Sequence, residues 1–323
     1  MRLLKLVPDN TNFPFMRFRL PAMALSILVI LGAMVLVGTR GLNYGVDFAG
    51  GLMMEVRVAE PVRVDEMRAV VNSAGAGSGT IQNFGDDRTV AIRLPLPPGD
   101  EAAVQRVVTR IQGIISDRYK GAEFRRVETV SGKVSGELVE TGALAVLLAM
   151  LGIAIYIWFR FEWQFGVGAL FSLAHDVAIT MGFFSLTQLD FDLNIVAAVL
   201  TIVGYSLNDT IVVYDRVREN LRKYRKMGII ELLDLSLNET LPRTIVTSLT
   251  MIIALATLVV LGGEVMFGFA VAMLLGIIVG TYSSIFVAAS ILIWLKVKPD
   301  TFVPATTVGE KPVMTNERLP GKR

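Results

Sequence analysis

An aspartate inside an apolar segment is the first candidate for chemistry. Asp209 lies roughly 15 residues into a run that begins near Asn194, which at about 1.5 Å per helical residue places its carboxyl some 22 Å deep. A bilayer's hydrocarbon core is about 30 Å thick, and an ionisable group within it costs a few kcal/mol or more. Thr201 and Tyr205 precede Asp209 at four-residue intervals, with Ser206 within one turn, so a helix would present them as one polar stripe.

The next apolar segment offers a cationic partner for this acid. Arg243, Thr247 and Thr250 share one helical face, and Pro242 suits the first turn of their helix. Because this helix runs in the opposite direction, Arg243 would reach a depth similar to that of Asp209 and could pair with it. We therefore predict that Asp209 titrates, with a proton occupancy that depends on access from each side. Two alternatives stay open, a static buried ion pair and an Arg243 that merely extends its head group into water.

A third polar stripe lies on the preceding apolar segment, which contains Ser172, His175, Asp176 and Thr180. Lipid is a poor environment for such stripes, so we place all three facing one another inside a helix bundle. His175 and Asp176 could extend a proton relay. Equally, the aspartate could accept a structural hydrogen bond from its histidine neighbour or from a tyrosine.

The composition that surrounds these residues is that of a multi-pass membrane protein. The 323 residues are 53% hydrophobic, and the mean hydropathy of +0.57 exceeds that of ordinary soluble proteins. Six apolar runs are long enough to cross a bilayer, and the first is expected to be an uncleaved signal anchor. The predicted spans are 21–39 and, within 138–298, five more at 138–158, 166–188, 194–214, 243–262 and 266–295.

Lysine and arginine in the short linkers predict the orientation. Arg160 follows the second span and a basic cluster from Arg216 to Lys226 follows the fourth, whereas the linker around Asp190–Asp192 has no basic residue. By the positive-inside rule both termini are cytoplasmic. The predicted cytoplasmic segments are the N-terminus at 1–20, a basic loop at 215–241 and a disordered tail at 299–323.

Residues 40–137 form a different, extracytoplasmic unit. Its 13 basic and 13 acidic residues balance, which argues against nucleic acid as a partner. Glu55 and Arg57 are expected to point outward from the first strand, and Gly85-Asp86-Asp87 to close a hairpin. The predicted strands and helices, at 52–58, 62–72, 80–84, 88–94, 101–119 and 123–130, follow the β-α-β-β-α-β order of a ferredoxin-like α+β domain.

Several site classes have no support in the sequence. Cysteine is absent and His175 is the single histidine, so we expect no disulfide, no thiol chemistry and no His-rich metal site. No P-loop, nucleophile elbow or zinc motif occurs, so we expect no cofactor and no enzymatic reaction. Gly276 and Gly280 form a GxxxG motif in the sixth span, a helix-packing signal.

Five stretches of the sequence resemble one known family, the bacterial protein-export membrane proteins SecD and SecF. The motif at Gly45-Val46-Asp47-Phe48-Ala49-Gly50-Gly51 is similar to that family's GxDFxGG sequence. The resemblance covers roughly residues 20 to 298, and the single outer domain of modest size is closer to the SecF branch than to SecD. The other stretches are Val134–Leu138, Arg160–Trp163, Leu241–Thr244 and Gly204-Tyr205-Ser206-Leu207-Asn208-Asp209-Thr210-Ile211-Val212-Val213-Tyr214-Asp215-Arg216.

This resemblance implies a function and a set of partners. It implies a proton-driven accessory subunit of the Sec translocase, in the resistance-nodulation-division superfamily, within the lipid of the bacterial inner membrane. Its partners would be SecD, the SecYEG channel, YajC and the translocating preprotein, on which a periplasmic 40–137 domain would act. Asp209 and Arg243 would be the proton-relay pair. Possible accessory residues are Tyr205, Ser206, Asn208, His175, Asp176 and Thr247.

Two other functions remain open from the sequence. A passive assembly scaffold would tolerate Asp209→Asn, whereas changes at Gly276, Gly280 or the 40–137 domain would disrupt partner binding. One half of a proton-driven exporter of small molecules or lipids would need an apolar pocket in the outer domain, which a unit of about 95 residues makes less favourable.

Overall fold

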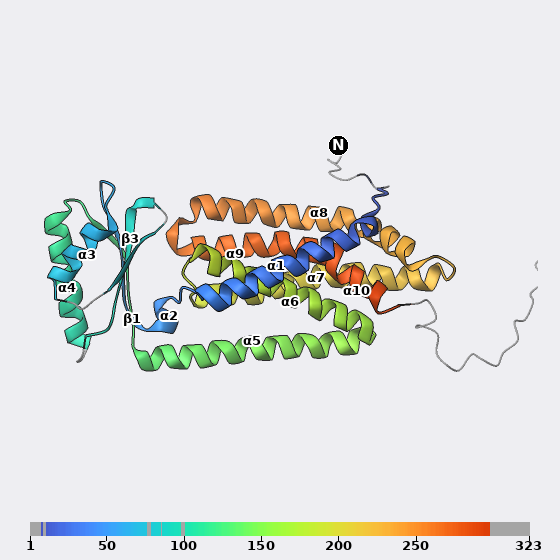
Figure 1. Cartoon of the computed structure of the whole chain (residues 1–323), viewed down its shortest axis with the longest axis horizontal. Coiled ribbons are helices and arrows are strands. Elements are labelled where there is room, and N and C mark those ends of the chain that lie inside the picture. The colour runs from blue at the N-terminus through green and yellow to red at the C-terminus, as the bar shows by residue number, and fades with distance from the viewer. Residues whose placement is uncertain (1–7, 9–10, 76–78, 85, 98–100, 298–323) are drawn as a thin grey trace, which may run out of the picture.

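The computed structural model describes residues 8, 11–75, 79–84, 86–97 and 101–297. It contains six helices long and apolar enough to cross a membrane, and a small sheet with two helices beyond one end of them (Figure 1). The chain is a multi-pass α-helical membrane protein with an α+β domain inserted between its first and second spans, as predicted. The expected tail at 299–323 and the hairpin residue at 85 lie outside the described residues.

The spans are longer than the apolar runs predicted from sequence. The sixth is interrupted, because α9 (Gly263–Ser283) passes into a π-helical turn, η2 (Ser284–Ala288), and ends as α10 (Ala289–Trp294). The other spans are η1 (Phe15–Phe18) continued by α1 (Arg19–Arg40), α5 (Gly132–Arg160), α6 (Trp163–Thr187), α7 (Leu193–Lys223) and α8 (Ile229–Leu261).

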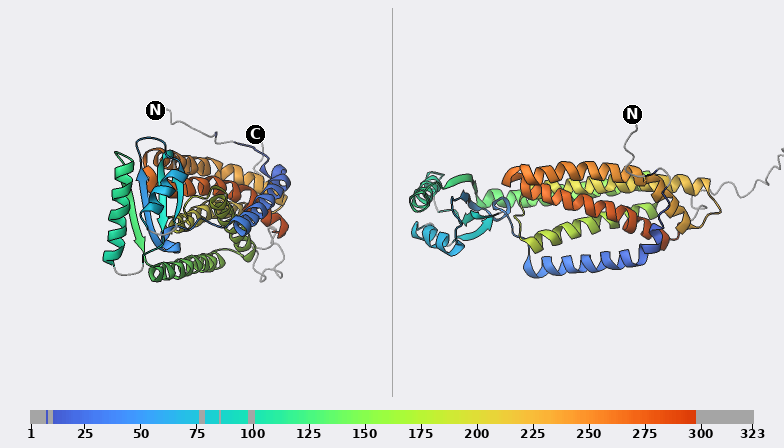
Figure 2. Two further views of the ribbon diagram at one scale, coloured as in Figure 1. Left: turned by 60° about the vertical axis from the view of Figure 1, so that its left-hand side comes forward. Right: turned by 90° about the horizontal axis from the view of Figure 1, so that it is seen from above.

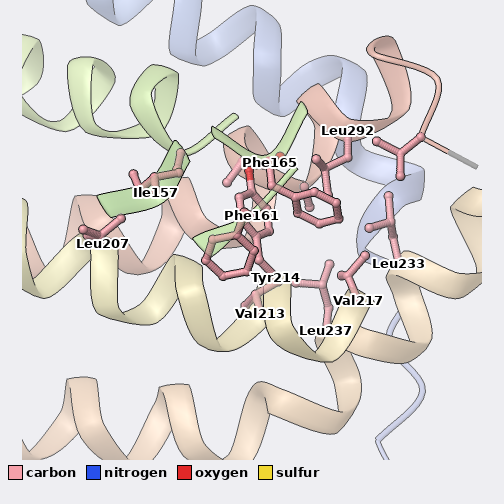
Figure 3. Close-up of a cluster of buried hydrophobic side chains, with 14 of the residues drawn as sticks. Ile157, Phe161, Phe165, Leu207, Val213, Tyr214, Val217, Leu233, Leu237 and Leu292 are labelled. Atoms are coloured by element: carbon pink, nitrogen blue, oxygen red, sulfur yellow. Dashed lines mark hydrogen bonds between the residues drawn. The ribbon is translucent and has the colours of Figure 1, made fainter. Parts of the chain in front are cut away.

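Helix α7 lies at the centre of the bundle, because α6, α8 and α9 all pack against it. Near the end remote from the sheet, the Tyr214 ring packs edge-on against Phe165 with centroids 5.0 Å apart, in a cluster that includes Phe161 and Leu292 (Figure 3). Helix α5, by contrast, runs along the outside (Figure 1), and only 6% of the residues in its most apolar stretch are buried. One span of this unit therefore leaves most of its surface unpacked.

The glycine pair of the sixth span brings α9 close to α7. A Cβ at Gly276 would lie 2.3 Å from the Ile202 side chain, and one at Gly280 would lie 3.1 Å from the Ser206 Cβ. Real side chains do not approach as closely as the first distance, so position 276 requires glycine at this crossing. The GxxxG motif therefore packs two helices of the same chain.

The sheet domain has the predicted order of elements. Its strands pair antiparallel in the order β2-β3-β1-β4, which is the ferredoxin-like arrangement. The helices α3 and α4 cover the face turned away from the membrane bundle (Figures 1 and 2), where Met67 and Ile111 are fully buried. The elements are β1 (Gly51–Arg57), α3 (Val64–Ser73), β2 (Thr80–Phe84), β3 (Asp86–Leu94), α4 (Glu101–Arg118) and β4 (Glu123–Val130).

The environment of Glu55 differs from the prediction that it points into solvent. This side chain is only 2% exposed, and its Oε1 has no hydrogen-bond partner among the described residues. A short helix, α2 (Val46–Ala49), packs Val46 against Met53 on this second face of the sheet, so the face is not open to solvent throughout. Period-2 alternation identified the face correctly but did not reveal that another element covers it. The second strand of the hairpin starts two residues earlier than predicted, since β3 begins at Asp86 and not at Arg88.

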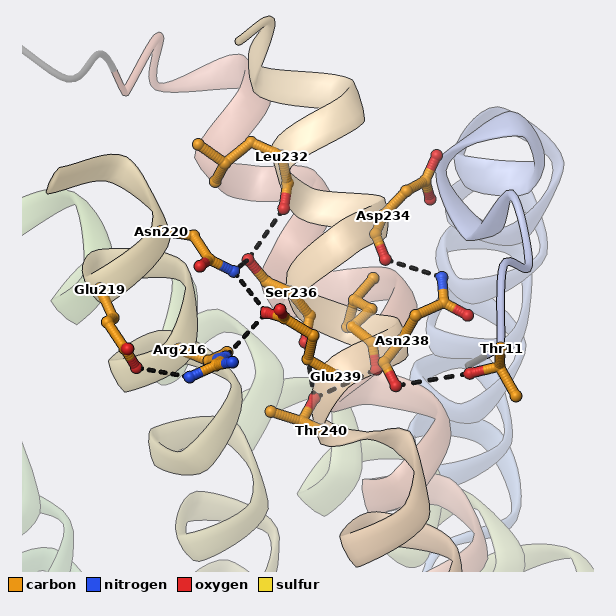
Figure 4. A network of polar contacts seen from close by, with 11 residues as sticks. Thr11, Arg216, Glu219, Asn220, Leu232, Asp234, Ser236, Asn238, Glu239 and Thr240 are labelled. Atoms are coloured by element: carbon orange, nitrogen blue, oxygen red, sulfur yellow. Dashed lines mark hydrogen bonds and ion pairs between the residues drawn. The ribbon is translucent and has the colours of Figure 1, made fainter. Parts of the chain in front are cut away.

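The expected basic loop at 215–241 is almost entirely helical. Helix α7 continues to Lys223 and α8 begins at Ile229, so only residues 224–228 lie between them. Polar contacts join the two helices (Figure 4): the Asn220 side-chain amide donates to Ser236 Oγ at 3.0 Å and to Glu239 Oε2 at 2.7 Å, and Arg216 donates to the same oxygen at 2.7 Å. These bonds extend both helices beyond their apolar runs.

Pro242 lies inside α8 and not in its first turn. A proline has no N–H, so the carbonyl four residues earlier, that of Asn238, loses its helical donor. The Thr11 hydroxyl donates to that carbonyl at 3.4 Å (Figure 4). The Asn238 side chain also binds the backbone N–H and C=O of Phe13, at 2.9 Å each. The segment before the first span thus supplies a substitute donor where the helix lacks its own.

Candidate functional site

Asp209 lies in the middle of the bundle, where three spans meet. Its side chain is 8% exposed. Oδ1 accepts a hydrogen bond from Thr244 Oγ1 of α8 at 2.7 Å, and Oδ2 accepts one from Ser284 Oγ of η2 at 2.5 Å. Hydrogen bonds to an ionised carboxylate are short and strong, so these donors make the buried charge tolerable. Through its two oxygens Asp209 therefore connects α7 to both α8 and η2.

The π-helical turn positions the second of these donors. π-Helical turns inside α-helices occur frequently at functional sites. Here η2 begins with Ser284, which binds Asp209, and ends with Ala288, whose carbonyl accepts a 3.1 Å hydrogen bond from the Tyr214 hydroxyl of α7. The irregular turn is therefore attached to α7 at both ends.

Arg243 does not form the expected ion pair with Asp209. Among the described residues, no ion pair joins the two; Arg243 is exposed, and it acts on Asp209 only by a longer-range Coulombic attraction. Consecutive residues on a helix point about 100° apart, so α8 can direct Thr244 at Asp209 only by turning Arg243 away. The prediction of a direct pair was wrong because sequence does not fix the rotation of α8 about its axis.

A second buried carboxylate lies nearby. Asp176 of α6 is completely buried, and its Oδ2 accepts hydrogen bonds from Ser206 Oγ of α7 at 2.5 Å and from Ser283 Oγ of α9 at 2.8 Å. Its Oδ1 lies 2.8 Å from Nδ1 of His175, which is 2% exposed. Each acid thus has two hydroxyl donors, and the donors Ser283 and Ser284 are adjacent in sequence.

The sequence-predicted residues lie in three environments: buried, half-buried and exposed. Asp209, Ser206, His175 and Asp176 are buried together, whereas Tyr205 is half-buried, with its hydroxyl 3.5 Å from Ser248 Oγ. Three others, together with Thr201 and Thr250 of the predicted stripes, lie on the outer surface of the bundle. These three are Asn208, Arg243 and Thr247.

Sequence reasoning missed four hydroxyl residues that line the interior. Thr244 and Ser248 are four residues apart on α8, as are Arg243 and Thr247. The sequence therefore offered two alternative polar faces for this helix. Ser283 and Ser284 are adjacent polar residues inside an apolar span, which is also an observable signal. The four missed residues are Thr244, Ser248, Ser283 and Ser284.

The GG segment, Gly45–Gly51, connects α7 to the sheet domain. Asp47 Oδ2 accepts a hydrogen bond from the backbone N–H of Leu193 at 3.0 Å, and so caps the first turn of α7. Phe48 packs against Phe191, with ring centroids 6.0 Å apart. Gly51 enters β1 with φ 118°, and a Cβ there would lie 2.7 Å from the Leu94 carbonyl oxygen. This position requires glycine, and its neighbour Gly50 also has a positive φ, of 67°.

The linker between α6 and α7 makes the second connection to the domain. Asp190 forms an ion pair with Arg93 of β3, and both side chains are 15% exposed. Asn43 joins them, because its amide donates to Asp190 Oδ1 at 2.9 Å and accepts from Arg93 at 2.8 Å. In the same linker, burial raises the pKa of Asp192, while its hydrogen bond from the Ile195 backbone N–H opposes that shift. Movement at this end of α7 would therefore reach the sheet directly.

The described residues do not support a metal centre. No group of three or more His, Cys, Asp or Glu side chains in that part of the chain could hold an ion. The buried cluster itself consists of two carboxylates, several hydroxyls and one imidazole.

Family models and curated relatives agree on the family. The model described as Protein export membrane protein SecD/SecF, C-terminal, matches residues 111–298, and the SecD/SecF GG Motif matches residues 35–62. The Protein translocase subunit SecF of Rickettsia conorii is 44% identical over 290 residues, which cover 90% of this chain and 94% of that protein. Its counterpart in Desulfurispirillum indicum is 47% identical over 285 residues, covering 87% and 91%.

Solved structures have the same fold. SecDF from Thermus thermophilus, described as a translocon-associated membrane protein, matches with a TM-score of 0.83 and 36% identity over 90% of this chain. This chain spans only 40% of that longer one. SecDF in a super-membrane-facing form matches with a TM-score of 0.64, again at 36% identity, over 89% of this chain and 39% of that one. The chain therefore belongs to the SecD/SecF family of protein-export membrane proteins.

Proposed function

We propose that this chain is an accessory subunit of the Sec protein translocase. Together with SecD, it uses the proton motive force to drive or complete preprotein transport across the bacterial inner membrane. The observation that supports this most directly is the burial of Asp209 between hydroxyl donors from two other spans. Relatives that are named translocase subunits support the assignment to protein export.

Protonation of Asp209 would change the contacts between helices. The ionised carboxylate accepts from both Thr244 and Ser284, whereas the protonated carboxyl must donate one hydrogen bond of its own. One of the two hydroxyls would then have to turn away or accept, which loosens either the contact with α8 or that with η2. One elementary charge crossing 100 mV releases about 2.3 kcal/mol, enough to shift a two-state equilibrium about fifty-fold.

The outer face of α7 and α8 supports SecD as the neighbouring subunit. Asn208, Arg243 and Thr247 are exposed in the middle of spans, where lipid would be a costly environment for a guanidinium. In the relative from Thermus thermophilus the matched region is 40% of one continuous chain, so further segments are available there to cover such a face. In this proposal Arg243 lies at the interface with SecD and completes the relay there. It acts on Asp209 by Coulombic attraction and not by direct contact.

The contacts at the other end of α7 would transmit the change to the sheet domain. The Asp47 cap and the Arg93–Asp190 ion pair connect that helix end to the domain on both sides. In this proposal residues 40–137 are periplasmic and act on the preprotein, while 1–20 and the 215–241 helical hairpin are cytoplasmic. The SecYEG channel and YajC complete the proposed assembly, without cofactor or metal.

Export into vesicles with and without a proton gradient tests the relay. The vesicles contain SecYEG, SecD and either the wild-type chain or Asp209→Asn, with assembly checked by co-purification. We expect Asp209→Asn and Arg243→Ala to abolish the gradient-dependent increase. Thr257→Val, which removes an exposed hydroxyl that bonds only to the Ile253 carbonyl of its own helix at 2.9 Å, should retain it. If Asp209→Asn retained the full increase in an assembled complex, the relay would be refuted and a passive scaffold favoured.

A further inference from the structure

The pair formed by His175 and Asp176 is a buried titratable unit that the relay through Asp209 does not use. Both residues lie on α6, and they are 2% and 0% exposed. Asp176 receives hydrogen bonds from Ser206 and Ser283 on one oxygen, and its other oxygen lies 2.8 Å from His175 Nδ1. Three groups thus converge on one carboxylate in the middle of α6, inside the bundle.

The charge state of Asp176 decides which imidazole nitrogen is free. An ionised carboxylate can only accept hydrogen bonds, so with Asp176 ionised Nδ1 of His175 carries the hydrogen that the two side chains share. In the neutral ring Nε2 then has an unprotonated lone pair. That atom is buried and has no hydrogen-bond partner among the described residues. A carboxylate that orients an imidazole in this way also stabilises the imidazolium.

An aromatic ring lies against the imidazole. The Tyr282 ring of α9 stacks on His175, with centroids 6.0 Å apart and planes 25° apart, so its π face could accommodate an imidazolium. Protonation of Nε2 would turn a unit of net charge −1 into a neutral pair, which is cheaper to bury.

The other titratable groups that face this unit are few. Helix α7 contributes Asp209 and the tyrosines Tyr205 and Tyr214, and α9 contributes Tyr282, which stacks on the imidazole. Helix α5 contributes Tyr156, and α8 contributes the exposed Arg243 next to Thr244. The charged ends of α1, at Arg19 and Arg40, enclose a stretch without a titratable side chain, and η2 and α10 contain none. Within this set Asp209 is the one buried acid that can influence the imidazole electrostatically.

We propose that Nε2 of His175 is a second proton-binding atom of the bundle, oriented by Asp176 and coupled to Asp209 through Ser283 and Ser284. The coupling element is the junction of α9 and η2, where adjacent serines bind the two acids. A change of protonation at one acid alters the bond that holds one serine, and so moves the backbone next to the other. The inference rests on the proposed function, because it adds a second site to the same proton path.

The single histidine makes this proposal directly measurable. With a purification tag that contains no histidine, the full chain labelled with ¹⁵N-histidine in lipid bilayers gives imidazole signals from His175 alone. At about pH 8 we expect the Nδ1–H tautomer with a bare Nε2, converting to the doubly protonated ring as the pH falls. An Nε2–H tautomer at about pH 8, or no second proton down to about pH 4.5, would overturn the proposal.

Variants test the orientation and the coupling separately. Asp176→Asn should remove the preference for the Nδ1–H tautomer. Asp209→Asn removes one negative charge and should lower the imidazolium-to-imidazole ratio at fixed pH by about threefold or more, whereas Thr247→Val should leave it unchanged. An identical ratio in wild type and Asp209→Asn would refute the coupling. Because the spectra need no gradient and no translocase, they can fail while the export assay succeeds, and the reverse.

Discussion

Removal of the Thr244 hydroxyl should destabilise the protein by an amount that depends on Asp209. Thr244 Oγ1 donates to Asp209 Oδ1 at 2.7 Å, and Thr244 is 2% exposed. Thr244→Val preserves the shape of the side chain but removes the donor. A hydrogen bond to a charged group is worth about 1.5–3 kcal/mol and one between neutral groups about 1 kcal/mol. Thr244→Val should therefore cost about 1.5–3 kcal/mol while Asp209 is ionised.

A double-mutant cycle isolates that contribution. In an Asp209→Asn background the partner is neutral, so Thr244→Val should cost about 1 kcal/mol or less, which leaves a coupling free energy of about 1–2 kcal/mol. Thr247→Val is the matched control, because its hydroxyl bonds only to carbonyls of its own helix at 3.0 and 3.1 Å. It should change stability by less than about 0.5 kcal/mol.

The assay is reversible denaturant unfolding of the four variants in mixed micelles at neutral pH, followed by tryptophan fluorescence. Equal costs of Thr244→Val in both backgrounds would refute the view that an ionised Asp209 is stabilised by this bond. A cost from Thr247→Val as large as that from Thr244→Val would show that the hydroxyl's position, inside or outside the bundle, is irrelevant. Either result would remove the physical basis of the proposed proton switch.

Two further predictions concern packing and pH. Gly276→Ala should destabilise the protein by about 1–3 kcal/mol, because the new Cβ would lie 2.3 Å from the Ile202 side chain. Adding Ile202→Ala to the same chain should recover part of the lost unfolding midpoint. No recovery would contradict the assigned α7–α9 contact. Burial raises the pKa of Asp192 in the folded chain, so its contribution to stability is largest below the unfolded pKa of about 3.9 and is lost as the pH rises through the folded value. Asp192→Asn, which keeps a capping side chain, should therefore gain in Tm relative to wild type between about pH 4 and pH 7, whereas Asp192→Ala should lose about 1 kcal/mol of capping at both. A Tm difference between Asp192→Asn and wild type that does not change with pH would contradict this assignment.

The sequence by itself determined the membrane class, the number of spans and the order of elements in the inserted domain. Twenty or so apolar residues in a row have few alternatives to a spanning helix, because every backbone group must be bonded internally in lipid. Alternating and helical periods likewise gave the β-α-β-β-α-β order. An acid inside an apolar run, Asp209, was also visible in the sequence, as were Gly50 and Gly51 within the motif that resembles the SecD and SecF sequences.

Only the tertiary structure decided which faces of the spans meet. A soluble helix shows its buried side by hydrophobic contrast, but lipid is as apolar as a bundle core, so the rotation of a membrane helix leaves little trace in sequence. That is why Arg243 was expected beside Asp209 and Thr244 was found there. The π-helical turn was equally invisible, because the bonds of Ser284 to Asp209 and of Tyr214 to Ala288 come from residues far apart in the chain. Helix rotation and long-range hydrogen bonds are set by all the spans together, and one segment read alone does not contain them.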